Sequence, residues 1–181
     1  MQQLLDWTLS AIREERSDFS WMEERRFDWT PLVNSAVSRI VEGQTVLILT
    51  DERRRWFGQY ILGTVNLPER KRPFLPFYPL LELFPNLRSI DGAQEIQLME
   101  DMLEISYPGG YFLWYIGEGD PLYTKLAYRN DENFLWLLDD QVPGSFSLSG
   151  SDPLLDIKLL QLYRLFDRTL EAALFSQVSL D

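Results

Sequence analysis

Three short runs of apolar residues recur along the chain, and each has the length of one strand. These runs are Thr45–Thr50 (TVLILT), Tyr111–Ile116 (YFLWYI) and Phe134–Leu138 (FLWLL). Continuous apolar runs rich in β-branched and aromatic residues are typical of parallel strands that are covered on both faces. Segments with helical spacing of apolar residues separate the runs. The sequence therefore predicts a mostly parallel sheet with helices on both faces.

Two weaker segments are expected at the edges of this sheet. Phe74–Tyr78 contains Pro76, which cannot donate a hydrogen bond to a neighbouring strand and so suits an edge position. Ser145–Leu148 alternates polar and apolar residues, as a strand with one exposed face does. We expect a three-layer α/β/α sandwich of about five strands, Rossmann-like in type.

The chain shows no linker or repeat, so we expect one domain over residues 1–181. Within it, N-terminal helices occupy 1–43, the sheet and its crossovers 44–150, and a long helix with a tail 151–181. The second helix is expected to start near Thr30 as its cap, with Pro31 in the first turn and Gly43 just past its end. The segment Ser20–Trp29 before it is expected to be a loop.

The last helix is predicted to start with Asp152 as its cap and to run to about Phe175. On a helical wheel, most of its apolar residues fall within one half of the circumference, as in a helix packed on a core. Four apolar residues fall instead among the charged residues of the other half: Ile157, Leu160, Leu174 and Phe175. Several apolar residues on one polar face indicate contact with another chain. The alternative is burial under the N-terminal helices.

The Ser20–Trp29 segment mixes Trp, Met, Phe and Arg, which are enriched at protein interfaces. Arg25 and Arg26 are the weaker candidates for a charged rim around a partner site. The alternative for this segment is that Trp21 and Phe27 cover the edge of the core while the arginines stay solvated.

The composition lowers the expectation of catalysis. The chain contains no Cys and no His, which removes thiolate nucleophiles, imidazole bases and the common zinc ligand sets. The loop Thr50–Arg55 follows the first predicted strand but lacks the Gly, Ser and Thr donors of a phosphate-binding loop. Neither a cofactor nor a metal is expected. The Ser149–Ser151 loop could hold an anion, and the acid pairs Asp139-Asp140 and Asp131-Glu132 could bind magnesium, but capping and solvation explain both features.

Charge and hydropathy limit the partners. The net charge is −11, so direct binding of nucleic acid would need a segregated basic patch. Two short basic runs, Arg53–Arg55 and Arg70–Arg72, each lie beside acidic residues. No apolar run approaches the length of a transmembrane helix, and the first residues lack the pattern of a signal peptide. A cytoplasmic protein without membrane contact is expected.

Several segments, in order along nearly the whole chain, resemble the HobA family. They are Leu5-Asp6-Trp7 with Arg13-Glu14-Glu15; Met22-Glu23-Glu24 followed by Trp29-Thr30-Pro31-Leu32; Leu47–Asp51 leading into Arg55-Trp56-Phe57-Gly58 and Tyr60-Ile61-Leu62; Met99–Tyr107 leading into Tyr111–Gly117; Phe134-Leu135-Trp136; and Leu154–Phe175.

This resemblance implies a fold similar to sugar isomerase (SIS) domains and to DiaA, a functional analogue. It implies a homotetramer of paired dimers that binds the N-terminal domain of the replication initiator DnaA and promotes its assembly at the chromosomal origin by raising its effective concentration. Leu174 and Phe175 resemble the Leu-Phe ending of the terminal helix in DiaA-like proteins. The alternatives are an SIS-type sugar-phosphate isomerase or phosphosugar sensor, and a structural subunit that does not contact the initiator.

Overall fold

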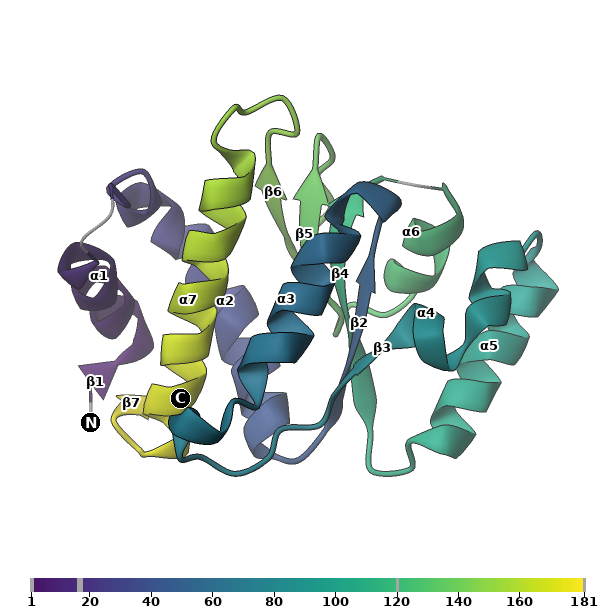
Figure 1. Cartoon of the computed structure of the whole chain (residues 1–181), viewed down its shortest axis with the longest axis horizontal. Coiled ribbons are helices and arrows are strands. Elements are labelled where there is room, and N and C mark those ends of the chain that lie inside the picture. Colours follow the sequence, from purple (N-terminus) through teal and green to yellow (C-terminus); the bar gives the residue numbers. More distant parts are fainter. Residues whose placement is uncertain (1, 16–17, 120, 181) are drawn as a thin grey trace.

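The computed structural model describes residues 2–15, 18–119 and 121–180. Its centre is a five-stranded parallel sheet in the order β3-β2-β4-β5-β6 (Figure 1). Along the chain, β2 comes first in this sheet, β3 pairs with one side of it, and β4 then pairs with its other side. The topological switch point of this doubly wound sheet therefore lies between β2 and β4. The strands are β2 (Thr45–Thr50), β3 (Phe77–Pro79), β4 (Tyr111–Glu118), β5 (Phe134–Leu138) and β6 (Ser145–Leu148).

The expected strands are present, with two differences at their ends. β4 continues beyond Ile116 to Glu118, where it still pairs with Leu138 of β5. β3 begins only at Phe77, because Pro76 has no N–H; its carbonyl instead accepts a hydrogen bond from the N–H of Val46 at 2.9 Å. β3 and β6 form the two edges, as predicted.

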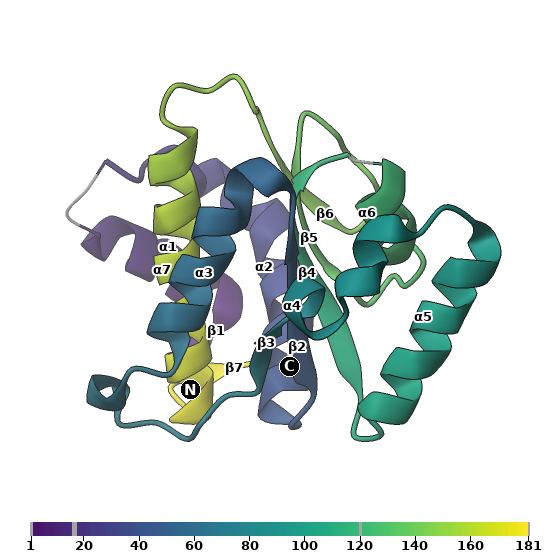
Figure 2. The same cartoon turned by 45° about the vertical axis from the view of Figure 1, so that its right-hand side comes forward.

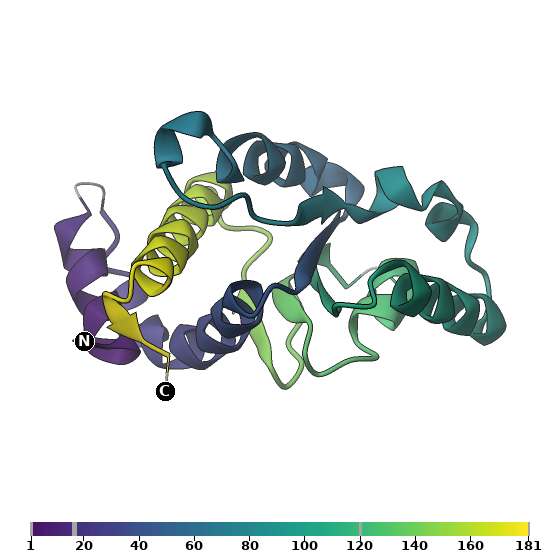
Figure 3. The same cartoon turned by 90° about the horizontal axis from the view of Figure 1, so that it is seen from below.

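Helices cover both faces of the sheet, which confirms the α/β/α prediction (Figures 2 and 3). Residues alternate along each strand: Val46 and Ile48 of β2 join one buried cluster, while Leu47 and Leu49 join another. The first cluster packs against α1 (Leu4–Glu14), α2 (Met22–Val41), α3 (Arg55–Val65) and α7 (Leu155–Leu174). The second packs against α4 (Leu80–Leu83), α5 (Ala93–Ser106) and α6 (Pro121–Ala127).

Large aromatic side chains fill the core beneath α2 and α7. The ring of Trp114 on β4 lies 5.0 Å from that of Trp136 on β5 and 4.7 Å from that of Phe166 on α7. Trp29 of α2 packs on Phe146 of β6 at 5.2 Å. Each such ring removes about 150–250 Å² of surface from water, so these contacts fix both helices on the sheet.

The prediction for the start of the second helix is wrong. α2 begins at Met22, so Ser20–Trp29 is not a loop and Pro31 lies inside the helix. Met22, Trp29 and Val33 are all buried on one face, which extends the apolar stripe two turns upstream of Pro31. Burial of these side chains offsets the lost hydrogen bond and steric clash of an internal proline, which cost about 3 kcal/mol.

The last helix ends as predicted, at Leu174 with Phe175 as its C-cap, but it begins at Leu155, so Asp152 lies in the turn before the helix and the prediction that it is the cap is wrong. The Asp152 carboxylate accepts a hydrogen bond from the N–H of Leu154 at 2.8 Å, and its partner Lys158 lowers the pKa of that carboxyl. Beyond Leu174, the short strand β7 (Val178–Ser179) pairs in parallel with β1 (Gln2–Gln3), which brings the two ends of the described chain together (Figure 1). None of the helices that the structure describes is both long and apolar enough to cross a bilayer.

Candidate partner-binding surface

The carboxyl end of the sheet at the switch point is filled by the chain's own charges. Asp51 follows β2, and its carboxylate accepts hydrogen bonds from the N–H of Arg54 at 2.9 Å and the N–H of Glu118 at 2.8 Å. The Arg54 guanidinium pairs with the carboxylates of Asp51 at 3.0 Å and Glu118 at 2.9 Å. Backbone N–H groups at this place hold anionic ligands in many doubly wound proteins. Here an internal carboxylate already takes those donors.

Little space remains beside this ion-pair cluster. A Cβ atom on Gly117 would lie 2.8 Å from the nearer carboxylate oxygen of Asp51, so the strand approaches that side chain as closely as a backbone can. The neighbouring cavity, between Thr50, Arg55 and Gly58, measures about 40 Å³. That volume is suited to water and is far below the several hundred Å³ of a typical small-molecule site.

The Ser149–Ser151 loop, which could have held an anion, also pairs with a carboxylate of the chain. The N–H of Gly150 donates to the Asp139 carboxylate at 2.8 Å, while the hydroxyls of Ser149 and Ser151 lie 3.0 Å from each other. The neighbouring carboxylate, Asp140, accepts a hydrogen bond from the Tyr128 hydroxyl at 2.9 Å. Burial and this hydrogen bond raise the pKa of Tyr128. Over the described ranges, no three acidic side chains converge as metal ligands.

The outer face of α7 carries the predicted contact residues, but only two of the four are exposed. Ile157 and Phe175 are 53% and 50% exposed. Leu160 and Leu174 are half-buried and pack against the core cluster, so they are less accessible than their place on the polar half of the wheel indicates. α1 and α3 flank α7 and cover residues at the borders of its buried stripe, which a single-helix wheel cannot show.

Most charged groups on this face are tied to neighbouring elements. Arg168 pairs with Glu14 at 2.7 Å, and Arg164 lies 3.5 Å from Glu15. Asp167 is buried, and Arg70 and Arg72 each contact its carboxylate at 2.6 Å. The second basic run therefore serves to anchor the loop after α3 on α7.

Arg25 and Arg26 do not lie near Phe175. Arg25 stacks over the Phe146 ring at 4.2 Å and donates to the carbonyl of Ser147 at 2.7 Å; burial lowers its pKa. Arg26 stacks over Phe27 at 4.1 Å. Both belong to the start of α2 at the carboxyl end of the sheet, whereas α7 ends at the opposite end (Figure 1).

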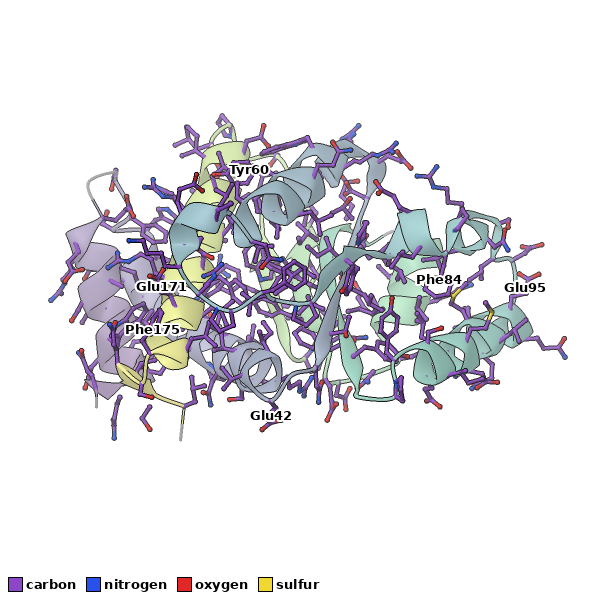
Figure 4. All side chains as sticks on the ribbon, turned by 60° about the horizontal axis from the view of Figure 1, so that its bottom comes forward. Glu42, Tyr60, Phe84, Glu95, Glu171 and Phe175 are labelled. Atoms are coloured by element: carbon purple, nitrogen blue, oxygen red, sulfur yellow. The ribbon has the colours of Figure 1, made fainter. Side chains whose placement is uncertain are left out.

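Sequence reasoning missed a second exposed apolar face on α3. Trp56 and Tyr60 repeat at the same helical spacing as the buried residues Phe57 and Ile61, but they are 38% and 40% exposed. The Tyr60 ring packs on Tyr163 of α7 at 5.8 Å, so the faces of α3 and α7 adjoin; Figure 4 shows Tyr60, Glu171 and Phe175 along them. The signal was present in the composition, because Arg55 is the one charged residue of α3.

Known proteins share the sequence pattern and the architecture of this chain. Residues 1–180 match the protein-family model described as "HobA: DNA replication regulator". The chain is 29% identical to the DNA replication regulator protein HobA of Helicobacter pylori, over 99% of this chain and 100% of that protein. It is also similar to HobA in a crystal structure of a HobA–DnaA (domain I-II) complex from Helicobacter pylori, with a TM-score of 0.78, 26% identity and 99% of both chains covered. A second crystal structure of HobA from Helicobacter pylori matches with a TM-score of 0.76, 27% identity and 99% of both chains covered. The chain therefore belongs to the HobA family of DNA replication regulators.

Proposed function

We propose that this chain is a non-enzymatic cytoplasmic adaptor that binds the N-terminal domain of DnaA and promotes assembly of the initiator at the chromosomal origin. The observation that carries the proposal is the likeness, over 99% of both chains, to a HobA chain crystallised with domains I–II of DnaA. The filled switch point supports a role in protein binding, because Asp51 takes the backbone donors that an anionic ligand would need.

The proposed contact is centred on Phe175, at the end of α7. Its ring is half exposed, and aromatic side chains of this kind dominate the energy of many interfaces. The preceding residue, Leu174, is half-buried and contributes the inner edge of this contact. Ile157 and Leu160 lie on the first half of the same helix, about 27 Å and about 22 Å from Phe175 at a rise of about 1.5 Å per residue. A folded domain laid along α7 would span that distance.

We propose that Arg25 and Arg26 lie at the periphery of the DnaA contact. The start of α2 lies beside the first half of α7, where the Lys158 ammonium is 4.9 Å from the Trp21 ring. A partner that reaches Ile157 would therefore approach these arginines. Rim charges affect association rates and salt dependence more than affinity.

We propose further that the protein is a homotetramer of paired dimers and that α3 contributes to self-association. A chain with a net charge of −11 repels copies of itself, so a self-contact is favoured where charge is lowest. The α3 face with Trp56 and Tyr60 is apolar and carries Arg55 alone. Tyr60→Glu is expected to lower the mass measured by light scattering; an unchanged mass would reject this face.

Calorimetric titration with DnaA domains I–II tests the partner site. Phe175→Ala is expected to weaken binding at least tenfold, since loss of an interface hot spot costs about 2 kcal/mol or more. The control is Ile105→Ala, because Ile105 is 81% exposed on α5, on the opposite face of the sheet from α7. Unchanged affinity in Phe175→Ala, or an equal loss in both variants, would reject the site.

The alternative of an SIS-type phosphosugar isomerase or sensor makes a different prediction. A phosphosugar that binds the folded chain would raise its melting temperature. We expect no shift across a phosphosugar panel, because the Asp51 carboxylate lies among the donors at the switch point. A saturable shift that Arg54→Ala abolishes would favour the alternative.

A further inference from the structure

A second apolar surface lies on the opposite face of the sheet from α7, between α5 and the segment that follows α4. A groove of about 490 Å³ separates these two walls. Phe84 and Glu95, which come from the two walls, are labelled in Figure 4. The apolar lining consists of Leu83, Phe84, Ile90, Leu98, Met99 and Met102.

α5 is apolar on two separate faces. Its inner face, with Ile96, Met99 and Leu103, is buried against the sheet. Its outer residues Leu98, Met102 and Ile105 are spaced by four and three positions, so they form one stripe. They are 59%, 42% and 81% exposed. A helix that only covers a sheet needs one apolar face, so this second stripe is available to another molecule.

The α5 side of the groove is acidic, with Glu95 in its lining. α5 contains Glu95, Glu100, Asp101 and Glu104 and no Lys or Arg. Glu100 pairs with Arg129 on the far side, but Glu95 and Asp101 flank the outer stripe. Arg88, on the opposite wall's segment, lines the small cavity near Asp51 instead of this groove. A ligand that buries the stripe would therefore meet apolar residues bordered by negative charge.

We propose that this groove binds an amphipathic helix of a partner protein, with apolar residues at helical spacing and Lys or Arg on both sides of them. Apolar anchors of a helix fill such a groove, and basic flanks complement its rim. The acidic rim disfavours an anionic lipid surface. It also disfavours a symmetric contact between two copies of α5, which would place like charges together.

The proposal is independent of the DnaA contact. α5 belongs to the layer built on Leu47 and Leu49, and α7 to the layer built on Val46 and Ile48. A helix in the groove and a domain on Phe175 would occupy opposite faces of the sheet. The protein would then join two partners, not only several copies of one.

Fluorescence anisotropy with the full chain tests this proposal. The probes are a labelled synthetic helix of Leu and Lys at amphipathic spacing and a matched helix of Leu and Glu. The Lys helix is expected to bind saturably and to weaken at high salt, and the Glu helix to bind at least tenfold more weakly. Equal binding of the two helices, or no saturable binding of the Lys helix, would overturn the proposal.

Variants locate the binding. Leu98→Ala with Met102→Ala is expected to weaken the Lys helix at least tenfold, and Asp101→Lys several-fold. Phe175→Ala is the matched control and should leave this binding unchanged while weakening DnaA. Thermal melts confirm that the variants fold. Unchanged binding in the groove variants would overturn the proposal. So would a fall in oligomer mass in Leu98→Ala with Met102→Ala, since the stripe would then contact a second copy.

Discussion

The carboxylate of Asp51 accepts a hydrogen bond from the N–H of Glu118 at 2.8 Å and so joins the carboxyl ends of β2 and β4. This contact lies at the switch point, where doubly wound sheets bind their ligands. In this protein the side chains of Asp51, Arg54 and Glu118 occupy that place by pairing with one another. Groups of exposed apolar side chains lie instead on the outer faces of α3, α5 and α7. The architecture therefore favours contacts with other proteins.

Asp51→Ala is expected to destabilise the fold by about 2–4 kcal/mol. The change removes a helix cap and leaves the buried Arg54 with Glu118 as its remaining partner. Urea denaturation measures the loss. Arg53→Ala is the control, because the Arg53 side chain is 81% exposed; it should change the free energy of unfolding by less than about 0.5 kcal/mol. Similar values for both variants would contradict a structural role for Asp51.

Two glycines of α3 should respond in opposite directions to substitution by alanine. A Cβ on Gly58 would lie 3.0 Å from the methyl group of Thr50, so Gly58→Ala is expected to destabilise by about 1–3 kcal/mol. Nothing lies within 4 Å of a Cβ on Gly63, so Gly63→Ala should stabilise by about 0.5–1 kcal/mol. Thermal melts of both variants test the packing of α3 on β2, and stabilisation by Gly58→Ala would disprove it.

Stability should fall between pH 10 and pH 12, partly because of Tyr163. Burial raises the pKa of Tyr163 to about 12 from the ordinary value of 10.0. The unfolded chain releases this proton near pH 10, so the group's contribution is complete below that pH and is lost as the pH approaches 12. Tyr163→Phe keeps the ring but removes the hydroxyl that contacts Thr64 at 2.9 Å. Denaturant midpoints across this range should decline less steeply in the variant; an equal decline would contradict the assignment.

The strands could be predicted because burial on both faces leaves an uninterrupted apolar run. Thr45–Thr50 and Phe134–Leu138 have the predicted bounds for that reason. The start of α2 could not be predicted from local signals, because a proline such as Pro31 is most often found in the first turn of a helix and so indicates a helix start. Its place inside the helix depends on Trp29 and Met22 packing into the core.

The exposure of surface residues was harder to predict than the sheet. A wheel for α7 alone placed Leu160 and Leu174 on the polar side, but contacts with other elements half-bury both residues. On α3, the helical spacing that Trp56 shares with the buried residues does not show that Trp56 is exposed. Phe175 was predicted correctly as exposed, because it ends the helix beyond the reach of neighbouring side chains.

Hydrogen–deuterium exchange of the full chain, alone and saturated with DnaA domains I–II, tests the central proposal most directly. It reports both whether binding occurs and which segment is covered. The account predicts protection over residues 168–180, at the end of α7, and no change in the loop 51–55 at the switch point. No protection anywhere, or protection confined to the carboxyl end of the sheet, would contradict it.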